Sequence, residues 1–165
     1  MPWTIAPITL DDVDEVARVH VRVWQEAYAG LMPADYLDGL DPAGFATNWR
    51  ERLLAPAPGV HSWLARDEAG VVGLSISGPA RDEDAPTAWQ LYAINVVARG
   101  HGTGVAKALL DTAIGDRAAY LWVVEGNDRA RAFYRKHGFT DDGVREQLPE
   151  TGTPEVRMSR AAVAR

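Results

Sequence analysis

The chain of 165 residues contains no cysteine. Disulfide bonds, thiolate metal sites and a cysteine nucleophile are therefore excluded. The chain also lacks any apolar run close to the ~20 residues that a helix needs to cross a bilayer. Its first residues do not combine a basic segment with an apolar one. We therefore expect a cytoplasmic protein that has no membrane partner.

Basic charge is scarce as well. Lysine and arginine number 17 against 23 aspartate and glutamate residues, which gives a net charge of -6 and an isoelectric point near 5.2. Because a nucleic-acid surface needs clustered basic residues, we expect no nucleic-acid partner, whereas cationic substrates such as amines are weakly favoured. The histidines lack the spacing of metal ligands, so no bound metal is expected: His20, His61, His101 and His137.

Size and composition predict one globular domain. A chain of this length with 47% hydrophobic residues can build a sizeable core. The sequence contains neither repeats nor low-complexity segments. We therefore expect residues 1–165 to form a single domain.

Hydrophobic periodicity, together with glycine and proline breaks, places helices and strands along the chain. Helices are predicted over residues 11–28, 33–40, 42–54, 102–114 and 127–137. Strands are predicted over residues 3–8, 60–66, 71–77, 87–97 and 118–124, with another beginning at Phe139 and a last one over 154–159. The mixture predicts an α/β fold.

Local patterns also indicate how some strands pair. The turn at residues 67–70 ends in glycine and predicts an antiparallel hairpin. Residues 118–124 are almost continuously apolar, which is typical of a strand in the centre of a sheet. Residues 154–159 alternate in polarity and predict a half-exposed edge strand, which could pair with a second copy in a homodimer.

A glycine-rich turn is the most informative feature of the chain. It joins the predicted strand 87–97 to the predicted helix 102–114 and contains Gly100, Gly102 and Gly104. A turn of this kind points several backbone N–H groups at a phosphate, because the first turn of a helix leaves them unpaired. We expect positive φ and close approach of a ligand at these glycines. The turn therefore predicts a pyrophosphate site.

Two common phosphate-binding patterns do not fit this turn. A dinucleotide fingerprint needs GxGxxG, but the sixth position is Val105 counted from Gly100 and Lys107 counted from Gly102. A Walker A loop needs glycine before lysine and Ser or Thr after it, whereas Lys107 lies between two alanines. Binding of NAD or ATP is therefore disfavoured.

A third pattern does fit. Residues 99–104 read RGHGTG, which resembles the R/Q-x-x-G-x-G/A acetyl-CoA pyrophosphate loop of the GNAT superfamily of acyl-CoA N-acyltransferases. Residues 121–139 resemble that family's second signature, a strand that ends in Asn and is followed by A-x-x-F-Y and then G-F. The resemblance is strong over about residues 91–139, because two separate motifs agree in order and distance.

The resemblance implies a fold. It implies an α/β (α+β) architecture with a mixed, mostly antiparallel twisted sheet of six to seven strands, flanked by about four to five helices. In the family, a central parallel pair of strands splays apart, and the pantetheine of the acyl-CoA lies in the gap. Residues 87–97 would supply one strand of that pair.

The resemblance also implies an activity. An N-acetyltransferase would transfer acetyl from acetyl-CoA, its cosubstrate, to a primary amine of a small molecule or peptide, by direct attack in a ternary complex. A backbone N–H near Val96 would polarise the thioester carbonyl. The residues that would contact acetyl-CoA are Asn95, Val96, Val97, Arg99, Gly100, His101, Gly102, Thr103, Gly104, Asn127 and Arg135. Asn127 is also a natural helix N-cap, and both roles can hold together.

Catalytic residues follow from the same resemblance. Tyr134 occupies the family's general-acid position, although a helical tyrosine of this kind can also simply pack in a core. Many relatives carry a glutamate base near the position of Gln90, and an amide cannot accept a proton from an ammonium. Glu125 and Glu26 are the substitute bases that we consider. The missing base leaves an alternative open, a non-catalytic acyl-CoA-binding sensor.

The acceptor site is predicted from the N-terminal region. Residues 23–33 are similar to the acceptor-side helices of many acetyltransferases of the superfamily. Trp24 and Tyr28 lie beside the break at residues 30–33 and are candidates to line the acceptor pocket, and Gln90 is a third candidate contact. No local pattern identifies the amine.

Overall fold

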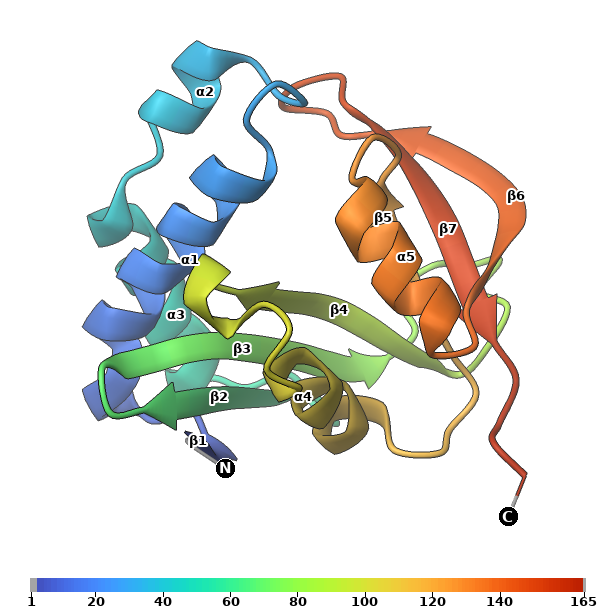
Figure 1. The fold of residues 1–165 in the computed structure, drawn as a ribbon, viewed down its shortest axis with the longest axis horizontal. Helices are drawn as coiled ribbons and strands as arrows, with labels where there is room; N and C mark the ends of the chain where they lie inside the picture. The colour runs from blue at the N-terminus through green and yellow to red at the C-terminus, as the bar shows by residue number, and fades with distance from the viewer. Residues whose placement is uncertain (1–2, 165) are drawn as a thin grey trace.

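One continuous sheet runs through the protein. The computed structural model describes residues 3–164, in which seven strands follow the order β1-β2-β3-β4-β5-β7-β6 (Figure 1). The strands are β1 (Trp3–Pro7), β2 (His61–Asp67), β3 (Gly70–Pro79), β4 (Trp89–Val96), β5 (Ala119–Val124), β6 (Thr140–Gln147) and β7 (Pro154–Arg160). Only β4 and β5 pair in parallel, and all other neighbours are antiparallel. The predicted sheet type is confirmed.

Helices cover both faces of this sheet. In residues 3–164 they are α1 (Val13–Ala27), α2 (Ala34–Asp38), α3 (Pro42–Leu54), α4 (Val105–Ile114) and α5 (Asp128–Lys136), with short 3-10 turns η1 (Leu10–Asp12) and η2 (Ala98–Gly100). On β3, alternate side chains face opposite layers. Leu74 and Ile76 pack with residues of α1 and α3, whereas the hydroxyl groups of Ser75 and Ser77 donate to carbonyls of α4.

The helix boundaries follow from local chemistry. Thr9 and Asp12 form a capping box, in which the backbone N–H of Thr9 donates to Asp12 Oδ2 at 2.8 Å. Asp41 caps α3 ahead of Pro42, which tolerates the first helical position because its missing N–H would have no partner there. Asn127 accepts from the N–H of Ala130 at 3.2 Å and caps α5. These short polar residues fix where the helices begin.

The parallel pair of strands separates along its length. β4 and β5 are in register only at Gln90 and Tyr120. Just beyond this point β4 has one extra residue, Tyr92, because its partners on β3 change from Ser77 opposite Leu91 to Ile76 opposite Ala93. A bulge of this kind bends a strand, so β4 turns away from β5. We call the boundary between β4 and β5 the seam. The paired position at Gln90 and Tyr120 is its closed end, and the separated position around Val96 is its open end.

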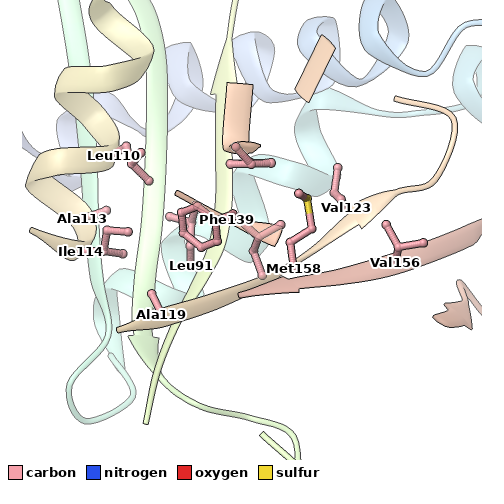
Figure 2. Packing of buried hydrophobic residues seen from close by; sticks show 11 residues of the cluster. Leu91, Leu110, Ala113, Ile114, Ala119, Val123, Phe139, Val156 and Met158 are labelled. Atoms are coloured by element: carbon pink, nitrogen blue, oxygen red, sulfur yellow. The ribbon is translucent and has the colours of Figure 1, made fainter. Parts of the chain in front are cut away.

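Apolar packing holds the two parts of the sheet together at the closed end. The cluster joins Leu91 of β4 and three residues of α4 to β5, β7 and the start of β6, as Figure 2 shows for the labelled side chains Leu91, Leu110, Ala113, Ile114, Ala119, Val123, Phe139, Val156 and Met158. Phe139, Ile114 and Met158 are fully buried. The few backbone hydrogen bonds between β4 and β5 are thus supplemented by side-chain contacts.

Two expectations about the sheet need comment. The 67–70 turn does form an antiparallel hairpin between β2 and β3. The prediction of an edge strand over residues 154–159 was wrong, because β7 lies between β5 and β6 and buries Val156 and Met158. A polar residue fits at position 157 because the buried Arg157 side chain pairs with Asp142 and with the exposed Asp84. A homodimer through β7 therefore loses its structural basis.

Within residues 3–164, no helix has both the length and the apolar composition that crossing a membrane would require.

Candidate functional site

A cavity of about 670 Å³ lies at the open end of the seam. Its walls come from the end of α1, the last residues of β4, the glycine-rich turn with the start of α4, and α5, and Figure 1 shows these elements around the gap between β4 and β5. A cavity of this size accommodates a drug-sized ligand. Because β5 has left β4 here, the edge of β4 faces the cavity rather than another strand.

The glycine-rich turn forms one wall of the cavity. Gly102 and Gly104 have φ of 76° and 92°, and a Cβ atom at either would meet nothing within 4 Å. Positive φ was also expected at Gly100, and this was wrong. Gly100 lacks a side chain for a different reason, since a Cβ there would lie 2.7 Å from Val96 Cγ1 and 2.9 Å from Val72 Cγ2.

Backbone N–H groups of this turn are available to a ligand. Those of Gly102 and Gly104 make no hydrogen bond to any residue that the structure describes, and both glycines line the cavity. The N–H of Val105 is bonded to the Thr103 hydroxyl at 3.3 Å, and that hydroxyl donates to the carbonyl of Gly100 at 2.7 Å. Thr103 thus stabilises the turn through its own hydrogen bonds and is not among the residues that line the cavity. Unpaired N–H groups at a helix N-terminus suit an anion.

The edge of β4 adds a further donor. The N–H of Val97 donates to Val72 on β3 at 3.0 Å, and backbone directions alternate along an antiparallel strand. The N–H of Val96 therefore points away from β3, toward the cavity that Val96 lines with Asn95 and Ile94. Val97 itself is 1% exposed in the core, so the expectation that it contacts a ligand is not supported by its placement. Asn95 is 7% exposed and lines the cavity, as expected.

Tyr134 of α5 lies on the opposite wall. Its side chain is 8% exposed, yet its hydroxyl makes no hydrogen bond to any residue in 3–164. Burial raises the pKa of Tyr134 well above its usual value, and the neighbouring Tyr28 adds to the effect. The phenol therefore stays protonated at every ordinary pH. A protonated hydroxyl group at the wall of a cavity, without a hydrogen-bond partner in residues 3–164, can donate its proton to a ligand.

Comparisons with known proteins identify the family of this chain. Residues 58–141 match the acetyltransferase (GNAT) domain family. The N-acetyltransferase YuaI of Bacillus subtilis is 33% identical to the chain, over 98% of this chain and 99% of its own length. The chain belongs to the GNAT acetyltransferase family.

Solved GNAT structures share the fold. A Corynebacterium glutamicum structure described as histone acetyltransferase HPA2 and related acetyltransferase superimposes with a TM-score of 0.71 at 24% identity, over 100% of this chain and 99% of that chain. The PaiA N-acetyltransferase of Thermoplasma acidophilum, solved in complex with coenzyme A, gives a TM-score of 0.68 at 15% identity, over 98% and 99% of the two chains. At these identities the likeness concerns the fold alone.

Two arginines that the GNAT resemblance assigned to the cosubstrate lie elsewhere. Arg99 makes a bidentate ion pair with Asp67, with nitrogen–oxygen distances of 3.0 and 3.1 Å, and also donates to the carbonyl of Val71. It thereby ties the turn to the β2–β3 hairpin. Arg135 lies 3.5 Å from Asp141 and is half exposed. Neither lines the cavity, whereas Arg129, which was not expected, does so and has no ion pair within residues 3–164.

The other expected GNAT cosubstrate contacts fit better. His101 lines the cavity beside Gly100, Gly102 and Gly104. Asn127 lines it while its side chain caps α5, so the two roles do occur at one residue. Sequence reasoning missed Arg129 because nothing in the A-x-x-F-Y pattern marks which side of α5 a given arginine occupies. Helical spacing from Phe133, which also lines the cavity, would have identified it, since residues four apart share a face.

The two substitute bases differ in placement. The carboxylate of Glu125 lies 2.6 Å from Arg145 and is absent from the cavity wall, so a direct role as base is not supported. Glu26 does line the cavity, where Arg22 one helical turn earlier pairs with it at 2.8 Å.

Gln90 is not part of the acceptor site. Its side chain is 7% exposed at the closed end of the seam, where Oε1 lies 2.8 Å from the Tyr120 hydroxyl and 3.0 Å from the N–H of Arg81. The Tyr120 hydroxyl donates to Asp82 Oδ2 at 2.6 Å, and Trp122 Nε1 donates to the same oxygen at 3.1 Å. The expected substrate contact was therefore wrong. Gln90 belongs to a network that holds β4 and β5 together.

The two aromatic candidates at the end of α1 also differ in their placement. Tyr28 lines the cavity and lies close to Tyr134. Trp24 is not among the lining residues, because its ring packs edge-on between Tyr28, His20 and Phe45 with centroids 5.3, 6.0 and 6.1 Å away. Trp24 supports Tyr28 from behind.

Proposed function

We propose that the protein transfers an acetyl group from acetyl-CoA to a primary amine of a small molecule or peptide, by direct attack in a ternary complex. The observation that carries this proposal is the open end of the seam. There, unpaired N–H groups, a free β4 edge and the unpartnered hydroxyl of Tyr134 surround one cavity. Membership of the GNAT acetyltransferase family supports the same reaction class.

The residues present fit a coenzyme A thioester. The N–H groups of Gly102 and Gly104 would bind the pyrophosphate at the N-terminus of α4, and the missing side chains leave room for it. Arg129 and His101 offer further polar contacts at the cavity wall. The β4 edge at Ile94 and Val96 would bond the pantetheine amides in place of a strand. Acetyl-CoA supplies an activated acyl group on a thiol that leaves readily.

Two groups of the chain would act on the reacting atoms. The N–H of Val96 would donate to the carbonyl oxygen as the neutral amine attacks the carbonyl carbon and negative charge develops there. When the carbon–sulfur bond breaks, the Tyr134 hydroxyl would donate its proton to the departing sulfur. No covalent bond to the protein forms, in accord with the absence of cysteine.

The amine must also lose a proton. Of the two carboxylates proposed as bases, only Glu26 lines the cavity, so it is the base that we retain. It would accept the proton directly or through one water molecule. Its ion pair with Arg22 at 2.8 Å orients the carboxylate on α1.

The test is release of free thiol from acetyl-CoA with a panel of primary amines, combined with a thermal-shift comparison of acetyl-CoA, NAD and ATP. The expected result is stabilisation by acetyl-CoA alone and amine-dependent thiol release. Tight binding of acetyl-CoA without thiol release from any amine would instead indicate a non-catalytic acyl-CoA sensor.

A further inference from the structure

Asn95 is a buried polar residue of the cavity wall whose side chain the fold does not use. It is 7% exposed, and it lines the cavity. Its carboxamide, which has two N–H donors and an acceptor oxygen, makes no hydrogen bond to any residue that the structure describes. In contrast, the carboxamide of Gln90 accepts from the Tyr120 hydroxyl, and that of Asn127 caps α5. The carboxamide of Asn95 is therefore available to a ligand.

Strand register shows which face of the sheet this carboxamide occupies. Asn95 is opposite Leu74 of β3, and opposite residues in antiparallel strands project to the same face. Leu74 packs with Val16 of α1, so Asn95 projects toward the layer of α1. The preceding residue, Ile94, is opposite Ser75, whose hydroxyl donates to a carbonyl of α4. Neighbouring side chains at the β4 edge thus point to opposite sides of the sheet.

The β4 edge therefore divides the cavity into two sides. On the side of α4 and α5 lie the glycine-rich turn, with its unpaired N–H groups, and Tyr134. On the side of α1 lie Asn95, Glu26 and Tyr28. A pyrophosphate at the N-terminus of α4 would occupy the first side. The second side is left for the acceptor, where a strand and a helix each contribute one polar side chain that can accept hydrogen bonds from an amine.

The chemistry of acetyl transfer distinguishes the two N–H groups of a primary amine. When the nitrogen lone pair attacks the thioester carbonyl carbon, the nitrogen becomes positively charged and carries both hydrogens. One of these protons leaves to Glu26, the base retained above. The other stays on the nitrogen of the product amide. A carboxamide oxygen can accept a hydrogen bond from this second N–H, but it does not take the proton.

We propose that Asn95 positions the acceptor by accepting a hydrogen bond from the N–H that the amine keeps, which makes the protein selective for primary over secondary amines. This role rests on the proposed acetyl transfer and specifies its acceptor class. A secondary amine has a single N–H, which must serve Glu26. Its second carbon substituent would then face the carboxamide of Asn95 and leave it without a partner, and a site built around a hydrogen bond rejects an analogue that lacks it.

The test compares primary amines with their own N-methyl derivatives. The probes are 1-aminobutane, 2-phenylethylamine and glycinamide, each paired with the N-methyl form, and thiol release from acetyl-CoA is measured. The proteins are the unmodified chain, Asn95→Leu, which has similar size but no hydrogen-bonding group, and the control Asn48→Leu, at an exposed position of α3. In the unmodified protein we expect kcat/KM for a primary amine to exceed that for its N-methyl form about 100-fold.

The variants separate acceptor positioning from folding and from cosubstrate binding. Asn95→Leu is expected to lower kcat/KM for primary amines about 10- to 100-fold and to change that for secondary amines less than about twofold, because only primary amines lose a hydrogen bond. The Kd for acetyl-CoA, measured by calorimetry, stays unchanged, and Tm is unchanged or higher because no residue loses a partner. Asn95→Ala gives the same loss of selectivity without added bulk, in case Asn95→Leu folds poorly. Asn48→Leu changes none of these quantities.

Two results would overturn the role of Asn95 while leaving acetyl transfer intact. One is equal kcat/KM for the primary and secondary amines in the unmodified protein. The other is an equal loss for both kinds of amine in Asn95→Leu and Asn95→Ala, which would assign a structural role to the residue. Absence of thiol release with every amine in the unmodified protein would instead contradict the proposed function, and this role with it.

Discussion

The two ends of the β4–β5 seam treat polar groups in opposite ways. At the closed end, Gln90, Tyr120 and Asp82 satisfy one another and the backbone around them. At the open end, the side chain of Tyr134 is also largely buried, but its hydroxyl borders the cavity and makes no hydrogen bond within residues 3–164. Within residues 3–164 the buried side-chain nitrogen and oxygen atoms without a partner are Trp3 Nε1 and Arg131 Nε, so the Tyr134 hydroxyl can be reached from the cavity. The comparison indicates that the hydrogen bonds at the closed end stabilise the fold, whereas the hydroxyl without a partner at the open end is available to bind a ligand.

Removal of the Tyr134 hydroxyl should give the largest effect. Tyr134→Phe keeps the ring against Phe139, whose centroid is 5.8 Å away, and removes only the proton donor. We expect kcat to fall about 10²- to 10⁴-fold, with the Kd for acetyl-CoA unchanged and Tm unchanged or higher. Steady-state thiol release and thermal melting measure these quantities. An unchanged kcat would reduce Tyr134 to a core residue.

A charge in the glycine-rich turn should weaken cosubstrate binding. Gly102→Asp places a carboxylate at the N-terminus of α4 where an anion is expected, and aspartate tolerates the φ of 76°. We expect the Kd for acetyl-CoA to rise about 10- to 100-fold, or about 1.4–2.7 kcal/mol. Isothermal titration calorimetry measures it. Gly143→Asp is the matched control, since Gly143 has φ of 88° and open space but lies on β6. Similar losses in both variants would argue against a phosphate site.

A substitution at the closed end should change the free energy of unfolding rather than the reaction rate. Tyr120→Phe removes the hydroxyl that donates to Asp82 and accepts from backbone N–H groups. We expect the free energy of unfolding to fall by about 1–2 kcal/mol, with kcat changed far less than in Tyr134→Phe. Urea denaturation and thiol release, measured on both tyrosine variants, test the contrast directly. If the two variants behaved alike, the distinction between the ends would not hold.

The smallest effect concerns pH. The folded-state pKa of Glu155 is raised above its ordinary value of 4.5, first by burial and then by Glu146 and Glu150, so ionisation of this group opposes folding. Stability is therefore lost as the pH rises above about 4.5 through the folded-state pKa. Glu155→Gln should raise Tm at pH 7, and the difference should vanish at pH 4. Melting curves across that range test it, with Glu51→Gln as the control that changes nothing.

Sequence patterns were sufficient to predict the helices and strands and the glycine-rich turn. Prolines, glycines and caps lie next to the helices, so the predicted 42–54 helix coincides with α3. Positions 102 and 104 were identified because positive φ at a helix start restricts the residue to glycine. These features are local, and a single sequence records them.

Features that depend on distant parts of the chain could not be predicted. Arg99 pairs with Asp67, 32 residues earlier, and no local pattern reveals that ion pair. Gln90 was interpreted as the position of a missing general base and as a substrate contact, although its partner is the buried hydroxyl group of Tyr120 on a neighbouring strand.

The single register position shared by β4 and β5 has a consequence for motion as well. With so few main-chain bonds across the seam, the sub-sheet β5-β7-β6 can fluctuate against the sub-sheet β1-β2-β3-β4 at a low energetic cost. A thioester lying along β4 and reaching α5 would contact both sub-sheets and hold them together. Amide hydrogen exchange should therefore slow on both sub-sheets when acetyl-CoA binds, including at strands that the ligand never touches.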